Sequence, residues 1–214
     1  MSGGAAVWTV VVPWLLLTWV FLWVSGRRGW WGCFVCGAVA AAVVMFPWLG
    51  HPLPFWTRAL MANFSVPLAG VLVIAVAGRV SGKSLFTSAD WNAAWIFGAA
   101  GAVALYPSAL GLGPRNLDAY ALGWPWLFWG QSFVLFAGVA VVAAFLLWRC
   151  NRFGILLLLA LLGYSVGFQE SENLWDYVLD PVFAAAAIAG VLRLGFRGLF
   201  LRNRGEAPRQ KRLS

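Results

Sequence analysis

The sequence predicts an all-α integral membrane protein, a bundle of about seven transmembrane helices with its N-terminus outside and its C-terminus in the cytosol. Composition, seven apolar runs and the placement of positive charge predict this class. Of the 214 residues, 62% are hydrophobic and only 10% are charged, whereas a soluble domain is about 25% charged and about half apolar. A soluble fold of this size could not cover so much apolar surface, and a lipid bilayer removes that difficulty.

The apolar runs give the predicted helices in order. A helix that crosses about 30 Å of hydrocarbon needs roughly 17–25 apolar residues, and seven runs approach this length. They cover residues 7–24, 30–49, 64–80, 91–110, 123–148, 153–168 and 181–194. The last two are short, so tilt or local thinning of the bilayer is expected there. No Lys or Arg precedes the first run, so it lacks the basic start of a cleavable signal peptide and is predicted to be retained.

The positive charges predict the orientation. If the connecting segments alternate from an outside N-terminus, 13 of the 15 Lys and Arg residues lie inside, and only Arg58 and Arg115 lie outside. Cytosolic loops are enriched in Lys and Arg, so this split favours an outside N-terminus and a cytosolic C-terminus. Residues 1–201 are the predicted transmembrane domain. Residues 202–214 form a basic tail that is predicted to be disordered and to touch anionic lipid.

The breaks between the runs carry turn and cap signals. Gly and Pro interrupt the chain in SGRRG after the first run and in GHPLP after the second. Asp90 is expected to cap the fourth helix, and RCNR at residues 149–152 is expected to form a tight turn. Asp180 followed by Pro181 is typical of an N-cap with proline at the first helical position.

The most informative polar segment is QESENLWDYVLDP at residues 169–181, which holds four carboxylates and an Asn between two apolar runs. If it is helical, Glu172, Asp176 and Asp180 share one face, because four residues make about one turn. Carboxylates this close repel one another, so the segment needs a positive partner. That partner is either a divalent cation, which carboxylate oxygens bind well, or an arginine from another outer loop. The alternative is a solvated acidic loop in which Asp180 only caps a helix.

These patterns predict a polar site at the outer face. His51 is the only histidine in the chain, which excludes a site built from several histidines. It could act as a general base, although a lone loop histidine is more often simply solvated. The candidate catalytic residues are Glu172, Asp176 and His51, and Glu172 and Asp176 are also the candidate metal ligands. The candidate binding residues are Arg58, Arg115, Asp118, Asn173 and Glu170.

Two further motifs are predicted to be structural. Cys33 and Cys36 form a CxxC pair, a spacing that is used in thiol redox chemistry. They follow the cytosolic arginines of the first loop, so we expect them to be reduced and dispensable. Ser108 follows Tyr106 and Pro107 at the outer end of the fourth run. No GxSxG sequence surrounds this serine, so the segment is predicted to be a helix end rather than a nucleophile site.

Two segments resemble patterns in small bacterial inner-membrane proteins of unknown function. They are LYPSALGLGPRNLDAYALGW at residues 105–124 and ESENLWDYVLDP at residues 170–181. The resemblance covers about a sixth of the chain. It implies a location in a bacterial inner membrane and suggests that the two outer segments belong together, and it supplies no activity or catalytic residue.

Three functions remain open at the level of sequence. The first is a factor, either an enzyme or an accessory subunit, that acts on or assists modification of a lipid or lipid-linked envelope component, with arginines meeting a phosphate. The second is a small transporter or channel, which would need ionisable groups within the bilayer. The apolar runs hold almost none, and Gln131 is a rare amide there. The third is a structural or assembly subunit. The expected partners are membrane lipid and other membrane proteins. Nucleic acid is not expected, because no polar segment interleaves basic and aromatic residues.

Overall fold

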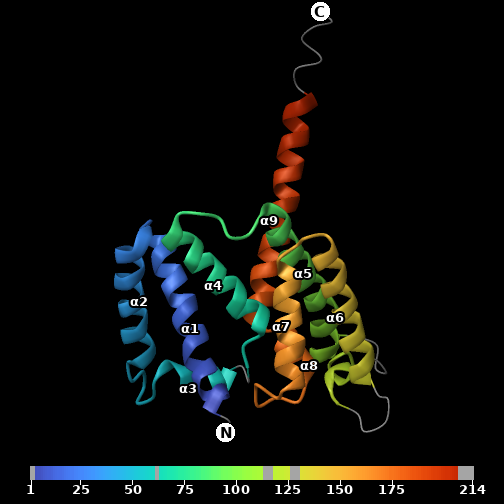
Figure 1. Ribbon diagram of the computed structural model, residues 1–214, viewed down its shortest axis with the longest axis horizontal. Helices are drawn as coiled ribbons and strands as arrows, with labels where there is room; N and C mark the ends of the chain where they lie inside the picture. The colour runs from blue at the N-terminus through green and yellow to red at the C-terminus, as the bar shows by residue number, and fades with distance from the viewer. Residues whose placement is uncertain (1–2, 61–62, 113–117, 126–130, 207–214) are drawn as a thin grey trace, which may run out of the picture.

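The computed structural model describes residues 3–60, 63–112, 118–125 and 131–206, and all of the regular elements within them are helices. The predicted all-α class is therefore confirmed. The longer helices run up and down alternately, and the start of α1 and the end of α9 lie at opposite ends of the bundle (Figure 1). These helices are α1 (Gly3–Val24), α2 (Gly29–Met45), α4 (Val66–Ser81), α5 (Ser88–Ala109), α6 (Gln131–Trp148), α7 (Phe153–Ser165) and α9 (Pro181–Glu206).

Three short helices gather at the end of the bundle that holds the N-terminus, which we call the outer end (Figure 1). They are α3 (Leu53–Leu60), the 3-10 helix η1 (Tyr120–Gly123) and α8 (Leu174–Val178). Helix α3 was not predicted, because the prolines of GHPLP indicated only a break. Proline is tolerated in the first turn of a helix, where its missing N–H has no intrahelical partner, and Pro54 occupies that turn.

Within the described ranges, one segment is by length and composition long enough and apolar enough to cross a membrane, residues Val7–Val24 of α1. Other apolar helices are shorter than this limit. They are Gly29–Met45, Val66–Ser81, Phe133–Trp148, Phe153–Ser165 and Pro181–Phe196. Seven membrane crossings therefore stay a prediction.

The core is formed by two groups of helices that meet at α4. Helix α1 packs against α2 and α4, α5 packs against α9, and α6 packs against α7, while α4 also contacts α7 and α9. Phe153, Leu157 and Phe183 are fully buried where these helices meet. Helices α5 and α9 approach closely at two glycines. A Cβ on Gly98 would lie 2.6 Å from that of Ala187, and a Cβ on Gly190 would lie 2.5 Å from a Trp95 ring atom.

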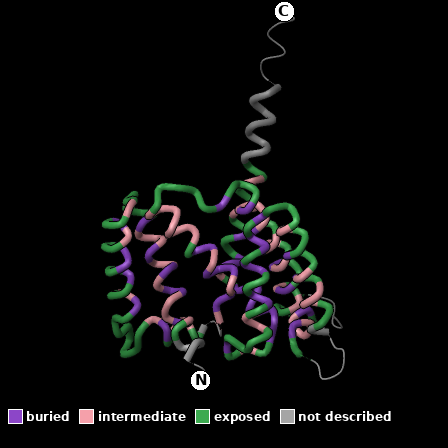
Figure 2. Tube along the Cα trace, viewed as in Figure 1, coloured by how far each residue is buried: buried purple, intermediate pink, exposed green. Residues whose placement is uncertain are grey.

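Large apolar side chains are exposed on the sides of several helices. Val103 of α5 is 71% exposed, Val141 of α6 is 68% exposed and Leu162 of α7 is 60% exposed. Buried residues follow the inward faces of the helices, and exposed residues follow the outward faces (Figure 2). In a bilayer, the side chains that face the core and the side chains that face the lipid are both expected to be apolar. An apolar exterior is therefore the arrangement expected of helices in lipid.

Two buried carboxylates each join the N-termini of two helices. Asp180 was predicted to cap a helix, and this is confirmed. Its Oδ1 accepts hydrogen bonds of 2.8 Å from the backbone N–H groups of Val182 and Phe183 in α9. Its Oδ2 accepts from the N–H (2.9 Å) and the hydroxyl (2.5 Å) of Ser65. Ser65 is itself the N-cap of α4 and accepts from the N–H of Leu68.

Asp90 has the corresponding role at the opposite, inner end, although the predicted position was wrong by three residues. Thr87 is the N-cap of α5, and Asp90 completes a capping box by accepting from the Thr87 N–H and hydroxyl. Its other oxygen accepts from the N–H of Arg152 at 2.8 Å, immediately before α7. Thr87 takes the cap because its hydroxyl reaches the third helical N–H while Asp90 bonds back to it.

Two boundaries differ from expectation. The run at residues 123–148 is not one helix, because Trp124 and Pro125, which follow η1, are not helical, and residues 126–130 lie outside the described part of the chain. Helix α9 continues past residue 201 to Glu206, and residues 207–214 lie outside the described part of the chain. The predicted tight turn is confirmed by Cys150, which has a φ of 54°.

Candidate functional site

The acidic segment is not a continuous helix. Residues 169–173 are not helical, and α8 begins only at Leu174. The side chain of Asn173 accepts a hydrogen bond of 2.9 Å from the N–H of Trp175, which caps α8. Asn and Ser side chains compete for backbone groups in this way and favour a cap over a helix interior.

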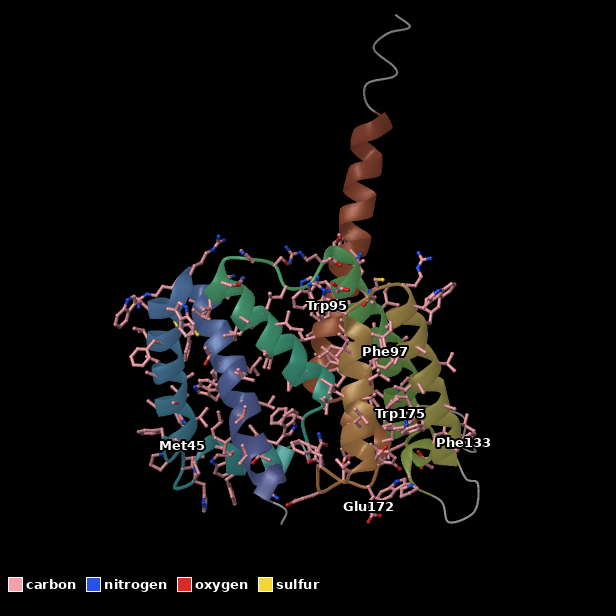
Figure 3. The ribbon with its side chains drawn as sticks, viewed as in Figure 1. Met45, Trp95, Phe97, Phe133, Glu172 and Trp175 are labelled. Atoms are coloured by element: carbon pink, nitrogen blue, oxygen red, sulfur yellow. The ribbon has the colours of Figure 1, made fainter. Side chains whose placement is uncertain are left out.

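The three carboxylates predicted to share a face are therefore in three different environments. Glu172 is exposed at the outer edge of the molecule (Figure 3), Asp176 is half-buried and Asp180 is 2% exposed. Among the described residues, no group of three or more His, Cys, Asp and Glu side chains is arranged to hold a metal ion. The expectation of a shared acidic face is wrong, because the helix that would create it starts after Glu172.

Asp176 accepts its hydrogen bonds from hydroxyl groups of this chain. The Tyr120 hydroxyl lies 3.2 and 3.3 Å from its two oxygens, and the Ser171 hydroxyl lies 2.5 Å from Oδ2. Burial raises the pKa of Asp176, and the bonds from Ser171 and Tyr120 oppose that rise. Burial and the neighbouring Asp176 charge raise the pKa of Tyr120 to about 12. Tyr120 therefore remains protonated and donates to the carboxylate.

Asp176, Tyr120 and Ser171 together form what we call the Asp176 cluster. Asn173 and Trp175 attach this cluster to η1. The fully buried Asn173 donates from Nδ2 to the Tyr120 carbonyl at 3.0 Å, and the Trp175 indole donates to the Ala119 carbonyl at 2.7 Å. Gly123 packs so closely that an added Cβ would lie 1.8 Å from Asn173 Oδ1. These contacts join residues 105–124 to residues 170–181, the two segments that the resemblance singled out.

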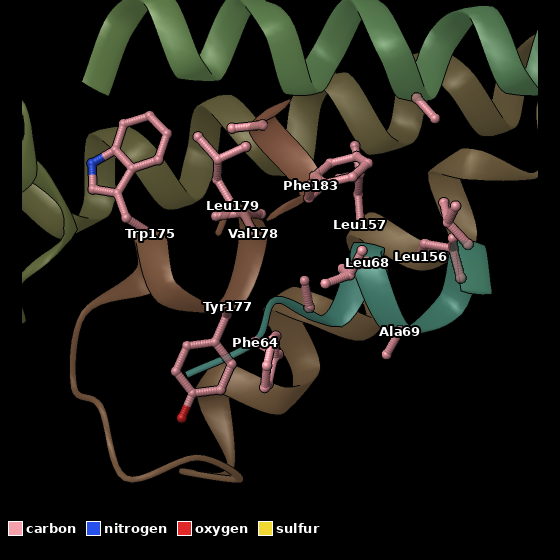
Figure 4. Packing of buried hydrophobic residues seen from close by; sticks show 14 of the residues in the cluster. Phe64, Leu68, Ala69, Leu156, Leu157, Trp175, Tyr177, Val178, Leu179 and Phe183 are labelled. Carbon is pink, nitrogen blue, oxygen red and sulfur yellow. The ribbon is translucent and has the colours of Figure 1, made fainter. Parts of the chain in front are cut away.

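On the other side of α8, Tyr177 belongs to the buried core. It is fully buried in the cluster that includes Phe64 and Leu68, and Figure 4 shows Tyr177 and Trp175 pointing to different sides of α8. Its hydroxyl accepts from the N–H of Gln169 at 3.0 Å. The short helix is thus held on both faces, by η1 on one and by the core on the other.

Arg58 supplies one of the two partners expected for the acidic segment, an arginine from another outer loop. Its Nη2 lies 2.9 Å from Oε2 of Glu170, and the two side chains are 38% and 39% exposed. Among the described residues, Arg58 forms no ion pair with Glu172 or Asp176. Arg115 lies outside the described residues, so its position relative to the cluster stays a prediction.

A pocket of about 600 Å³ lies beside Arg58, between α3 and α1. Its walls are largely apolar. The lining residues are Thr9 of α1 and Pro54, Phe55, Arg58 and Ala59 of α3. Phe55, Arg58 and Ala59 are three and four residues apart, so they share one face of α3. Arg58 is therefore the one charged residue among the described residues that line this largely apolar hollow.

His51 and Asp118 have local roles. The exposed His51 ring stacks on Phe55, with ring centroids 4.0 Å apart, and meets the Trp56 ring edge-on at 6.2 Å. Asp118 is exposed and accepts from the N–H groups of Tyr120 and Ala121, as in a turn that precedes a short helix. Neither side chain has a hydrogen bond to Asp176 in the described structure, so the geometry does not gather the predicted residues into one catalytic centre.

Three polar residues of this region were not predicted as site residues: Gln169, Ser171 and Tyr120. Gln169 is 5% exposed and donates from Nε2 to the Phe64 carbonyl at 2.8 Å. The same carbonyl also accepts a hydrogen bond from the Trp8 indole. Its Oε1 has no hydrogen-bond partner within the described residues. Gln169 and Ser171 stand in the polar stretch that was singled out, so their position could have indicated them. No local signal identifies Tyr120, because its partner Asp176 is 56 residues away.

The cysteines lie away from this site. Cys33, Cys36 and Cys150 are free thiols. Cys36 is buried, and its Sγ lies 3.8 Å from Oγ of Ser25, near the inner end of α1. Their dispensability stays a prediction.

Comparison of the chain with protein-family models, with curated proteins and with solved structures finds no match. The resemblance to small bacterial inner-membrane proteins therefore stays an expectation, and function is inferred from the geometry of the outer end.

Proposed function

We propose that the protein is a multi-pass bacterial inner-membrane protein that binds a lipid or lipid-linked envelope component at its outer face and assists its modification. In this proposal the helices α1, α2, α4, α5, α6, α7 and α9 cross the membrane. Support comes from the exposed apolar side chains on α5, α6 and α7, which water would disfavour and lipid would accommodate.

The charges and the helix directions support the same orientation. Arg27, Arg79, Arg149 and Arg152 lie in or beside the turns at the end of the bundle opposite α3 and α8. The start of α1 and the end of α9 lie at opposite ends of the bundle, as an odd number of crossings requires. Basic residues collect on the cytosolic side, so the outer end with its pocket faces away from the cytosol.

The pocket beside Arg58 carries the proposal of lipid binding. A volume of about 600 Å³ is within the range of small-molecule sites, which is about 300–1,000 Å³. Apolar walls from Pro54 and Phe55 suit an acyl chain, and the guanidinium of Arg58 suits a phosphate or carboxylate. The pocket is also at the end of the bundle, where a headgroup would lie.

Binding is favoured over catalysis and over transport. The Asp176 carboxylate accepts hydrogen bonds from Tyr120 and Ser171, so the described geometry supports a positioning role and no chemical step. Transport would require ionisable groups along a path between the helices. The buried acidic residues of the described chain, Asp90 and Asp180, instead cap helices at opposite ends.

The membrane topology is tested by fusions to the C-terminus. We expect a C-terminal fluorescent protein to be bright and a C-terminal alkaline phosphatase to be inactive, because the C-terminus would lie in the cytosol. The control is a phosphatase fused after Leu112, which follows α5 at the outer end and should be active. An active phosphatase at the C-terminus would contradict the proposed orientation.

Lipid binding is tested by filling the pocket. We expect Ala59→Trp to reduce the lipid that remains bound to the detergent-purified protein by about tenfold, because the indole would occupy the space that the acyl chain needs. Native mass spectrometry measures the bound lipid. The matched control is Leu112→Trp, which adds an indole at an exposed position of the same end away from the pocket lining. Equal lipid on the wild type and both variants would contradict the proposal.

A further inference from the structure

We propose that the pocket recognises the phosphate group of a membrane phospholipid through Arg58, and that Glu170 occupies Arg58 until the lipid displaces it. This inference rests on the proposed lipid-binding function and assigns the ligand class to the pocket. It names Arg58 as the residue that selects the headgroup and Glu170 as an internal competitor for it.

The Arg58–Glu170 pair is suited to exchange. Both side chains are more than a third exposed, and they come from segments 112 residues apart that meet at the surface. Exposed ion pairs contribute little to stability because water screens them and both side chains lose rotamer freedom. Separating this pair therefore costs the fold little.

A phospholipid can make more hydrogen bonds to this guanidinium than Glu170 makes. Glu170 accepts from Arg58 Nη2 through a single oxygen, Oε2. The two unesterified oxygens of a phosphodiester can take two parallel N–H bonds from one guanidinium. The lipid would therefore replace a one-oxygen contact by a two-oxygen contact of the same charge.

The pocket walls favour a lipid over free phosphate. Arg58 shares its face of α3 with Phe55 and Ala59, and Pro54 and Thr9 complete the lining. Phe55 is 48% exposed although its ring is large and apolar. An acyl chain would cover this surface, whereas an inorganic ion would leave it in water.

The test uses full-length protein in detergent and two fluorescent lipids with identical acyl chains, phosphatidylglycerol and diacylglycerol, which lacks a phosphate. We expect the wild type to bind phosphatidylglycerol more tightly. Arg58→Gln should weaken phosphatidylglycerol binding about tenfold, which corresponds to about 1.4 kcal/mol, and leave diacylglycerol binding unchanged. Glu170→Gln should strengthen phosphatidylglycerol binding by up to about fivefold, the range for an exposed pair. Excess inorganic phosphate should not displace either lipid.

The controls separate this inference from the proposed function. Glu172→Gln removes the same charge from an exposed residue two positions along the segment and should leave both affinities unchanged. Arg58→Lys should keep part of the selectivity, and retained diacylglycerol binding shows that each variant is folded. Failure of the wild type to bind either lipid overturns the proposed function. Binding of both lipids with a preference that Arg58→Gln leaves intact, or equal effects of Glu170→Gln and Glu172→Gln, overturns this inference alone.

Discussion

Replacement of Asp180 by alanine is expected to lower the free energy of unfolding by about 3–5 kcal/mol. The carboxylate is 2% exposed and accepts from Ser65, Val182 and Phe183, with two of its bonds coming from Ser65. A buried donor that loses its acceptor costs about 1–3 kcal/mol, and four donors are affected. Local relaxation recovers part of the sum. The substitution would release the N-termini of α4 and α9 together.

A graded series distinguishes this bridge from an ordinary helix cap, whose loss costs about 0.5–2 kcal/mol. Ser65→Ala removes one hydroxyl and should fall in that lower range, while Asp180→Asn should be intermediate because its amide N–H₂ faces other donors. Asp118→Ala, at an exposed turn, is the control. Chemical unfolding in detergent gives the differences, and a loss for Asp180→Ala no larger than that for Asp118→Ala would show that the bridge does not join the helices.

Alanine at Gly123 is expected to destabilise the outer end by about 3 kcal/mol, near the upper part of the range for overpacking. The new Cβ would lie 1.8 Å from Oδ1 of Asn173 and 2.8 Å from a ring atom of Trp175. Neither neighbour can move cheaply. Asn173 is fully buried with both ends of its amide bonded, and Trp175 is bonded to Ala119.

The mechanism can be checked with a second substitution. Asn173→Ala removes the clashing atoms, so Gly123→Ala should cost less in that background, and the two free-energy changes should not be additive. Gly138→Ala is the matched control. Its Cβ would have no atom within 4 Å, and a glycine-to-alanine change inside a helix should stabilise the protein by about 0.5–1 kcal/mol. Equal effects at Gly123 and Gly138 would contradict the close packing of η1 against Asn173.

Both predictions concern contacts that hold α8 and the residues around Asp176 in place. Asp180 fixes the start of α9 immediately after α8, and Gly123 lets η1 approach α8. The pocket beside Arg58 is formed by α3 and α1 and lies outside both contacts. Destabilisation by Asp180→Ala or Gly123→Ala should therefore disturb the Asp176 cluster more directly than it disturbs lipid selectivity at Arg58.

The helical class, the order of the long helices and the capping of α9 by Asp180 could be predicted from the sequence alone. These features depend on composition and on neighbours within one or two turns, such as Asp180 before Pro181, and such signals are local in the chain. The same local rules failed at residues 169–173. There the carboxylate spacing allowed a helix with a shared acidic face, but the Asn173 side chain bonds the backbone and α8 starts only at Leu174.

Only the tertiary structure decided which residues of the outer end meet. Three hydrogen bonds connect residues far apart in the chain. Ser65 donates to Asp180, 115 residues away, Arg58 donates to Glu170, 112 residues away, and Tyr120 donates to Asp176, 56 residues away. The charge pattern correctly required a partner for the acidic segment, but any outer arginine satisfied that requirement equally well. Which partner is used depends on how the helices pack, because packing sets the distances between their ends, and no local pattern encodes those distances.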